Sequence, residues 1–319
     1  MSQASLTVDL LEPPPPGDGS SVIAAKNPWR LAWQRLRSDP VAIACAAIIV
    51  LIVVVALIAP LIADAVGHSP NEADQSGGLT PEGLPLGPSW SHLFGTDYLG
   101  RDVFLRVVFA ARISLLSGVV ASSLAIVAGV VVGLFAGYAG GLLDSFLSRT
   151  MDVILSFPFL LFGIALVSIV GPSLTVVIGV IAFFSWASVG RIVRGQTISL
   201  KEREYVEAAR SLGAGGLRIM FVEILPNLVA PVLVYLTLLI PSAIVFEATL
   251  SFLGLGVIPP TPTWGNMLAE SLGFYQVAWW YVLFPAAALL ITTLAFNLLG
   301  DSVRDALDPR GDRLFRQSR

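Results

Sequence analysis

The sequence is poor in charged residues, and this scarcity excludes a soluble domain. Only 13% of its 319 residues are Asp, Glu, Lys or Arg, whereas 55% are hydrophobic. A soluble domain carries about 25% charged residues, so roughly half of the usual polar surface is missing. A chain of this composition must be solvated by lipid, and we therefore predict an integral membrane protein.

Cysteine and lysine are also scarce. The single cysteine, Cys45, excludes a disulfide or a thiolate metal cluster within one chain. ATP hydrolysis needs a Gly-rich loop in which a lysine is followed by Ser or Thr. The only two lysines are Lys26, followed by Asn27, and Lys201, followed by Glu202. Neither can serve a phosphate-binding loop, so we expect no catalytic residue, metal site or cofactor in this chain.

Six apolar runs are each near the roughly 20 residues that a helix needs to cross a bilayer. Gly171-Pro172-Ser173 is the only separation between the third and fourth runs, which predicts a tight turn and an antiparallel hairpin. The sequence thus predicts an all-α polytopic membrane protein with six transmembrane helices. The runs are Val41–Ile62, Ile113–Tyr138, Val153–Val170, Leu174–Val189, Leu228–Phe252 and Tyr281–Leu299.

The cations divide unequally between the two sides of such a protein. Sixteen of the 19 Lys and Arg residues fall in segments on the side of the N-terminus, and only Arg101, Arg106 and Arg112 fall on the other side. Because cytoplasmic segments carry the excess of Lys and Arg, both termini are expected in the cytoplasm.

The segments around the spans complete the expected organisation. Residues 1–26, with the run Pro13–Pro16, are typical of a disordered tail. Residues 27–63 combine an amphipathic surface helix (Asn27–Arg37) with the first span. We expect an extracytoplasmic loop over 64–104, a five-helix core over 105–300 with a cytoplasmic loop at 195–226, and a C-terminal tail over 301–319.

Both histidines, His68 and His92, fall in the expected extracytoplasmic loop. They are interpreted as solvated loop side chains, with binding of a metal such as nickel as the alternative.

Two features inside the spans suggest helix packing or a translocation path. Gly129, Gly133, Gly137 and Gly141 recur every four residues, which predicts a glycine face for close helix packing or for sliding in a moving transporter. Glu247 lies in the fifth run, where a carboxylate is costly. It indicates either a pore, cavity or helix-partner position, or a residue near the outer end that reaches the interface.

The cytoplasmic loop carries a pattern of its own. Tyr205, Ala208, Ala209 and Leu212 are small or apolar at helical spacing, which predicts a short helix over 202–212 that Gly213 stops. A second apolar stripe predicts a second short helix that Pro226 ends. The small Ala-Ala face could fit closely into the groove of a partner. The second stripe consists of Leu217, Met220, Phe221 and Ile224.

The residues Glu207-Ala208-Ala209, Gly213 and Leu225-Pro226 resemble the EAA loop of permeases from ATP-binding-cassette (ABC) importers. In that family this loop forms the coupling helix, which fits a cleft of the ATP-binding subunit. The resemblance assigns this docking role to Tyr205, Glu207, Ala208, Ala209, Leu212, Gly213, Leu225 and Pro226. Glu223 stands where the family pattern expects an apolar residue.

Two further segments, Phe94–Leu115 and Glu247–Leu268, are similar to the C-type subunit of dipeptide, oligopeptide and nickel permeases. The likeness covers residues 27 to about 310. It implies a type I importer permease (MetI-like) fold in a bacterial cytoplasmic membrane and a B-type permease as heterodimer partner. It also implies one or two ABC ATPases, which bind ATP and Mg, and an extracytoplasmic solute-binding protein; no nucleic acid is implied. Di- or oligopeptides are the expected cargo, with nickel, glutathione or another small solute as alternatives.

Two other classes of function fit less well. A secondary transporter would need broken helices and several ionisable groups within the spans, and only Glu247 is evident. An intramembrane enzyme would need paired catalytic groups, but Cys45 has no partner in view and both histidines lie outside the spans.

Overall fold

The computed structural model describes residues 28–74 and 76–307, and within these ranges the chain is helical, without a β-strand. The expected tail of residues 1–26, and residues 308–319 of the expected C-terminal tail, lie outside the described residues. The elements are α1 (Pro28–Ser38), α2 (Pro40–Leu57), α3 (Ala59–Val66), α4 (Val103–Ala139), α5 (Gly141–Ser156), α6 (Phe159–Val170), α7 (Leu174–Lys201), α8 (Glu204–Ser211), α9 (Gly216–Arg218), the π-helix η1 (Ile219–Ile224), α10 (Leu225–Phe252), α11 (Trp264–Ser271) and α12 (Trp279–Leu307).

Among the described residues, five helical segments are long and apolar enough to cross a membrane. They are α2, α4, α7, the continuous α9–η1–α10 segment and α12. A sixth crossing exists when α5 and α6, which are bent by 84° relative to each other, count as one broken span. The predicted all-α polytopic protein is confirmed, with five candidate spans among the described residues, or six if the bent pair is one span.

The third span expected over Val153–Val170 is not one continuous helix. The helix ends at Ser156, Phe157 is extended (φ −78°, ψ 134°), and α6 begins after Pro158. A residue before proline is pushed out of the helical region by the proline ring, which accounts for the break. The predicted turn at Gly171-Pro172-Ser173 is present, and the Ser173 hydroxyl caps α7 by accepting from the amide of Val176.

The first span is also interrupted. The run Val41–Ile62 was expected to be one helix, but α2 ends at Leu57 and α3 starts at Ala59, with Ile58 outside the helical region between them. Pro60 lacks an amide hydrogen and cannot continue the hydrogen-bond ladder of α2. Its ring suits the first turn of a new helix, so α3 leaves α2 in a new direction.

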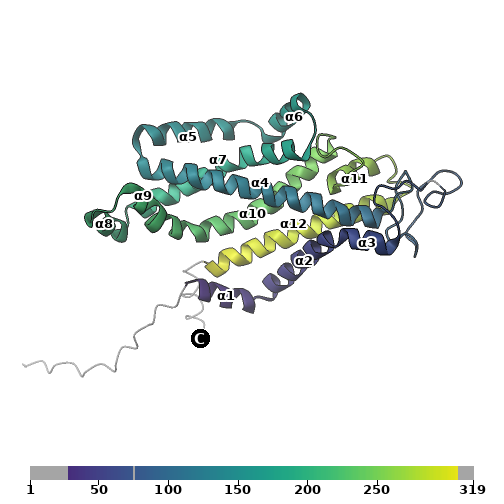
Figure 1. Ribbon diagram of the computed structural model, residues 1–319, viewed down its shortest axis with the longest axis horizontal. Helices are drawn as coiled ribbons and strands as arrows, with labels where there is room; N and C mark the ends of the chain where they lie inside the picture. The colour runs from purple at the N-terminus through teal and green to yellow at the C-terminus, as the bar shows by residue number, and fades with distance from the viewer. Residues whose placement is uncertain (1–27, 75, 308–319) are drawn as a thin grey trace, which may run out of the picture.

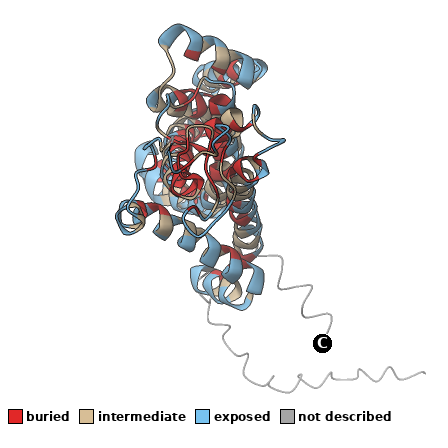
Figure 2. Ribbon diagram, turned by 90° about the vertical axis from the view of Figure 1, so that its right-hand side faces the viewer, coloured by how far each residue is buried: buried red, intermediate tan, exposed pale blue. Residues whose placement is uncertain are grey.

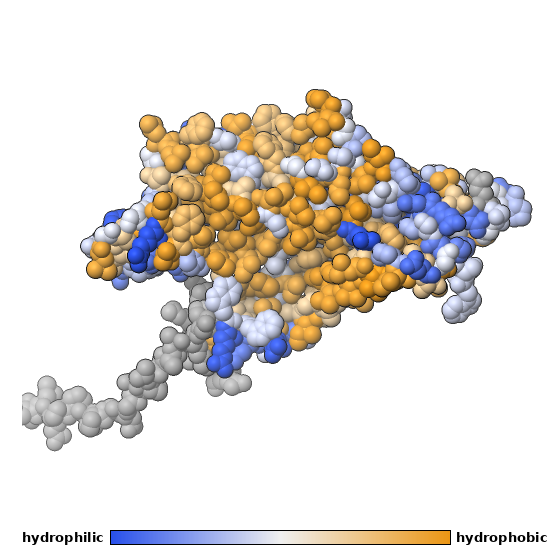
Figure 3. Space-filling view, in the orientation of Figure 1, coloured by the Kyte–Doolittle hydropathy of each residue, from blue (hydrophilic) through white to orange (hydrophobic). Residues whose placement is uncertain are grey.

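The molecule has two polar ends and an apolar middle (Figures 1 and 3). The α8 end holds α1, α8 and the last turns of α12, and the loop end holds residues 67–102 and α11. The Ser302 hydroxyl donates to Asp39 at 2.7 Å, and the Arg35 guanidinium donates to the Ala306 carbonyl at 3.3 Å. These bonds fix the first described helix to the last one at the same end.

The glycine face of α4 packs directly on α7. A Cβ atom at Gly129 would lie 2.6 Å from the Val189 Cβ, and one at Gly137 would lie 2.7 Å from the Thr197 Cβ. At Gly133 it would lie 2.5 Å from the Gly190 carbonyl oxygen. The predicted close packing is thus present for these three glycines. Gly141 does not belong to the face, because α4 ends at Ala139 and the chain turns through Gly140 into α5.

Buried residues gather at the centre of the loop end (Figure 2), and a cluster of charges lies among them. Arg101 contacts Asp97 at 2.6 Å and Glu270 at 3.0 Å, and Arg106 contacts Glu270 at 3.1 Å. The Tyr281 hydroxyl donates to the same Glu270 oxygen at 2.6 Å. The loop before α4 is therefore tied to α11 and α12. Asp97 and Arg101 of this link belong to the segment Phe94–Leu115, which resembles the C-type permease subunit.

Glu270 balances two buried guanidinium groups, so its removal should be costly. We expect Glu270→Gln to destabilise the protein by about 3 kcal/mol, because one carboxylate, Asp97, would remain for Arg101 and Arg106. Thermal unfolding of the detergent-solubilised protein measures this. Glu72→Gln removes an exposed carboxylate at the same end and serves as the control. Equal melting temperatures of the two variants would contradict the assigned role of the cluster.

The interpretation of both histidines as solvated is wrong for His92. Its side chain is buried, and its Nδ1 lies 3.2 Å from Asp102, which also caps α4 by accepting from the Leu105 amide. His68 is exposed, with its ring centroid 6.0 Å from that of His92. In the described part of the chain, no three His, Cys, Asp or Glu side chains are grouped to hold a metal ion.

Candidate functional site: the α8 segment

The short helix predicted over 202–212 is confirmed as α8. The helix α7 continues to Lys201, so the chain leaves it later than the expected loop start at residue 195. Glu204 and Glu207 lie in the first turn of α8, and Arg210 lies in the last. Acidic residues in the first turn and a basic residue in the last turn interact favourably with the helix macrodipole. This interaction stabilises a helix of only eight residues.

Gly213 ends α8 in the way that the sequence predicts. Its φ of +85° is in the left-handed region, which glycine adopts without steric cost. The Gly213 amide donates to the Arg210 carbonyl, and the Ala214 amide donates to the Ala209 carbonyl, each at 3.0 Å. This pair of bonds is a Schellman motif. A Cβ at Gly213 would have no atom within 4 Å, so the turn is open to a partner.

Val206 anchors α8 to the rest of the protein, a role that the sequence pattern does not reveal. Its side chain is fully buried, although its neighbours Tyr205 and Glu207 are exposed. A single valine in a short polar helix gives no periodic signal, and only the fold supplies the surface beneath it. It packs in a cluster with Ile126, Leu134, Val189, Val193, Ile219, Met220, Ile224 and Leu228.

The predicted small-residue face lies beside that anchor and is largely exposed. Tyr205 is 38% and Leu212 is 89% exposed, Ala208 is exposed and Ala209 is half-buried. Successive helical residues are rotated by about 100°, so positions 205, 208, 209 and 212 share a face. We call Tyr205, Ala208, Ala209, Leu212 and Gly213 the α8 patch. It is an apolar surface on a polar end of the molecule, where a monomer has no reason to expose it.

A polar notch lies beside the α8 patch. It has a volume of about 720 Å³ and is lined by Leu200, Glu202, Arg203, Glu204, Tyr205 and Asn227. Partial burial raises the pKa of the Tyr205 hydroxyl, while Arg203 opposes the rise and Glu223 adds to it. The hydroxyl therefore stays protonated near neutral pH and can donate a hydrogen bond to a partner.

The second short helix, expected to end at Pro226, is wrong. Gly216 to Phe252 is continuous, because the π-helix η1 joins α9 to α10. The Leu225 amide donates to the Met220 carbonyl five residues earlier, and Pro226 follows in the first turn of α10. A π-turn shifts the hydrogen-bond pattern just before the residue that has no amide hydrogen, so proline does not interrupt the helix. Leu225 is half-buried and Pro226 is exposed.

Glu247 lies far from the α8 segment, near the other end of α10. Its side chain is fully buried and accepts hydrogen bonds from Ser251 at 2.7 Å and from Ser114 of α4 at 3.0 Å. The carboxyl group thus links α4 and α10, which is a helix-partner position. It does not reach the surface of this chain.

The chain matches two protein families. Residues 129–313 match the binding-protein-dependent transport system inner membrane component, and residues 27–80 match the N-terminal transmembrane domain of oligopeptide transport permease C. The dipeptide transport system permease protein of Alkalihalophilus pseudofirmus is 42% identical over 297 residues, which cover 93% of this chain and 94% of the relative. The glutathione transport system permease protein of Escherichia coli O157:H7 is 43% identical over 285 residues, which cover 89% and 91%.

The first family match covers more than half of the chain, and both relatives align with nearly its whole length. The chain belongs to the inner membrane components of binding-protein-dependent transport systems, and it is an ABC transporter permease of the dipeptide/oligopeptide C type.

Proposed function

We propose that this permease forms half of a translocation pathway for small peptides, and that a B-type permease forms the other half. An extracytoplasmic binding protein delivers the peptide, and one or two separate ABC ATPases bind ATP and Mg. The observation that carries this proposal is the α8 patch, an exposed apolar surface on a short helix fixed by Val206 and the Schellman turn at Gly213.

The α8 patch docks in a cleft of the ATPase. One end of the α8 segment continues from α7, and the other enters the continuous helix that runs from Gly216 to Phe252. A displacement of α8 therefore moves two spans as rigid bodies. ATP binding closes the ATPases and moves the coupling segments, and the spans change from inward-open to outward-open.

The α8 end faces the cytoplasm in this proposal, so both termini are cytoplasmic in a bacterial inner membrane. The cation distribution supports this orientation, since positive charge marks cytoplasmic segments. The loop end then faces the binding protein. The cluster of Arg101, Arg106, Asp97 and Glu270 gives that protein a rigid platform.

Small peptides are the cargo that the relatives support best. One relative is named for dipeptide transport and another for glutathione, which is itself a tripeptide. The two are almost equally similar to this chain. Glutathione is therefore the second candidate cargo within the same class.

Affinity purification followed by uptake assays tests this function. The tagged full-length chain, expressed with the other proteins of its transport system, is expected to retain ATPase chains and a second permease. Cells that contain the system should take up labelled dipeptide in competition with unlabelled dipeptide or glutathione. Uptake should stop when this chain is deleted. Purification as a functional solitary chain, or uptake that is indifferent to peptides, would refute the proposal.

A further inference from the structure

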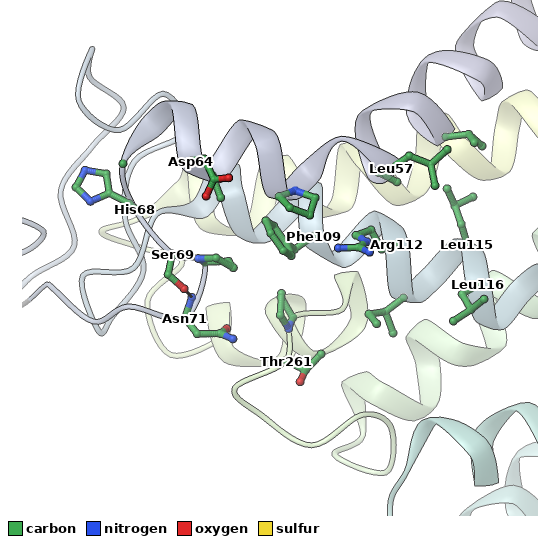
Figure 4. A pocket seen from close by; sticks show the side chains of 18 of the residues that line it. Leu57, Asp64, His68, Ser69, Asn71, Phe109, Arg112, Leu115, Leu116 and Thr261 are labelled. Atoms are coloured by element: carbon green, nitrogen blue, oxygen red, sulfur yellow. Dashed lines mark hydrogen bonds between the residues drawn. The ribbon is translucent and has the colours of Figure 1, made fainter.

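A groove of about 1090 Å³ runs between α2–α3 and α4 near the loop end (Figure 4). Its lining extends across the helix break at Ile58, from the end of α2 into α3. Its lining is divided. One part is apolar and includes Val53, Leu57, Leu116 and Val119, and the other part carries the polar side chains of Asp64, His68, Ser69, Asn71 and Arg112.

Arg112 differs from the two other cations at this end. Arg101 and Arg106 are buried in ion pairs, whereas Arg112 is exposed, and no carboxylate of the described residues lies within 4 Å of its side chain. Its guanidinium lies 5.9 Å from the centroid of the Phe109 ring. Figure 4 shows it between the polar residues Ser69 and Asn71 and the apolar Leu115 and Leu116. A cation in this position attracts an anionic group that enters the groove.

The level of Arg112 along α4 matches the surface of the hydrocarbon layer. With 37 residues, α4 is about 55 Å long, and the hydrocarbon is about 30 Å thick. When α4 is centred in the layer, about 13 Å projects at each end. Arg112 lies about 14 Å from the start of α4 and is thus near the level at which lipid phosphates begin.

We propose that this groove binds one phospholipid that carries an ammonium headgroup. Its phosphate pairs with Arg112, and its ammonium group pairs with Asp64 on the opposite wall. An acyl chain lies along Leu57, Leu116 and Val119, which are all strongly exposed in the isolated chain. The order of an anion, a cation and an apolar channel along the groove is complementary to such an amphiphile. The lipid fills the space between α3 and α4 and joins the broken first span to the second one.

Photolabelling of the assembled transporter in lipid nanodiscs tests this site. The probes are phosphatidylethanolamine and phosphatidylglycerol that carry a diazirine in one acyl chain, and labelled peptides are identified by mass spectrometry. We expect the ethanolamine lipid to label the wall around Leu57, Leu116 and Val119. Arg112→Gln should lower this labelling about tenfold, as expected for the loss of a charge-assisted contact, and Arg112→Lys should retain most of it. Asp64→Asn should abolish the preference for ethanolamine over glycerol lipid.

Matched variants separate the site from general effects. Arg149→Gln removes an exposed cation of α5 and should leave the labelling unchanged. Val119→Trp should fill the groove and stop labelling, while Leu124→Trp, on α4 outside the groove, should not. This pair tests the site even if Arg112→Gln fails to fold. Wild-type labelling in Val119→Trp or in a folded Arg112→Gln would overturn the proposal. The absence of groove labelling in the wild-type assembly, as when another protein covers this face, would also overturn it.

Discussion

Glu207→Lys is expected to reduce peptide uptake at least about hundredfold, because it reverses a charge at the proposed ATPase contact, where a repulsive pair costs several kcal/mol. Glu207 is exposed in the first turn of α8, so the variant loses only a favourable macrodipole interaction of about 0.3–1 kcal/mol within the chain itself. Insertion into the membrane should therefore persist. Peptide uptake, the stimulation of ATPase activity by the binding protein, and the recovery of the ATPase with the tagged permease measure the expected loss of coupling.

A charge reversal at the opposite end provides the control. Glu82→Lys changes an exposed carboxylate at the loop end by the same amount and should leave the ATPase attached. Normal uptake by Glu207→Lys would remove the coupling role from α8. Loss of the protein from the membrane would instead indicate a structural role for Glu207.

Gly213→Asp should likewise abolish uptake. Asp and Asn tolerate the left-handed conformation at a cost of about 1 kcal/mol, so α8 should still form. Because a Cβ at this position meets no atom of the chain, the main effect is a new charge where the partner approaches. Gly213→Asn adds the same bulk without charge and should retain clearly more uptake than Gly213→Asp. Equal uptake by the two variants would show that the charge has no effect there.

The second large effect is expected at the contact between α4 and α7. Gly133→Ala places a methyl group 2.5 Å from the Gly190 carbonyl oxygen, and a backbone atom cannot move aside as a flexible side chain does. Forced overpacking of this kind costs about 1–3 kcal/mol or more, and it should outweigh the higher helix propensity of alanine. The melting temperature of the solubilised protein and its amount in the membrane should both fall.

Gly179→Ala is the matched control for this prediction. Gly179 lies in α7, and a Cβ there would have no atom within 4 Å. The variant gains about 0.5–1 kcal/mol of helix propensity and creates no clash, so it should be neutral or stabilising. Similar melting temperatures of Gly133→Ala and Gly179→Ala would mean that α4 and α7 can move apart without a loss of stability, which would contradict the prediction.

Several features could be predicted from the sequence because a local pattern determines them. The glycine spacing gives the close face of α4, since glycines four residues apart must share one side of a helix. Gly213 gives the end of α8, because the left-handed turn belongs to that residue itself. The cation count predicts that both ends of the chain lie on the same side, and α1 and the end of α12 do lie at the same end of the molecule (Figure 1).

Other features depend on residues that meet only in the folded chain. Val206 is buried because the π-helix and α7 pass beneath it, and nothing in its neighbourhood in the sequence signals this. Glu270 lies 164 positions after Arg106, so their ion pair has no local signature. The breaks at Ile58 and Phe157 lie just before Pro60 and Pro158, and prolines can also be tolerated inside a span. A hydropathy pattern shows how long and how apolar a run is, but it does not show whether the helix changes direction within that run.

The π-helix at Ile219–Ile224 sets the rotational phase of the fifth span. A π-turn accommodates one more residue than an α-turn, and one residue corresponds to about 100° of rotation around the helix axis. All side chains after η1 are therefore turned by this angle relative to an uninterrupted α-helix. Glu247 meets Ser114 on α4 because of this offset, although more than twenty residues separate it from η1. One additional residue beside the α8 segment thus determines which face of α10 its neighbours encounter along its entire length.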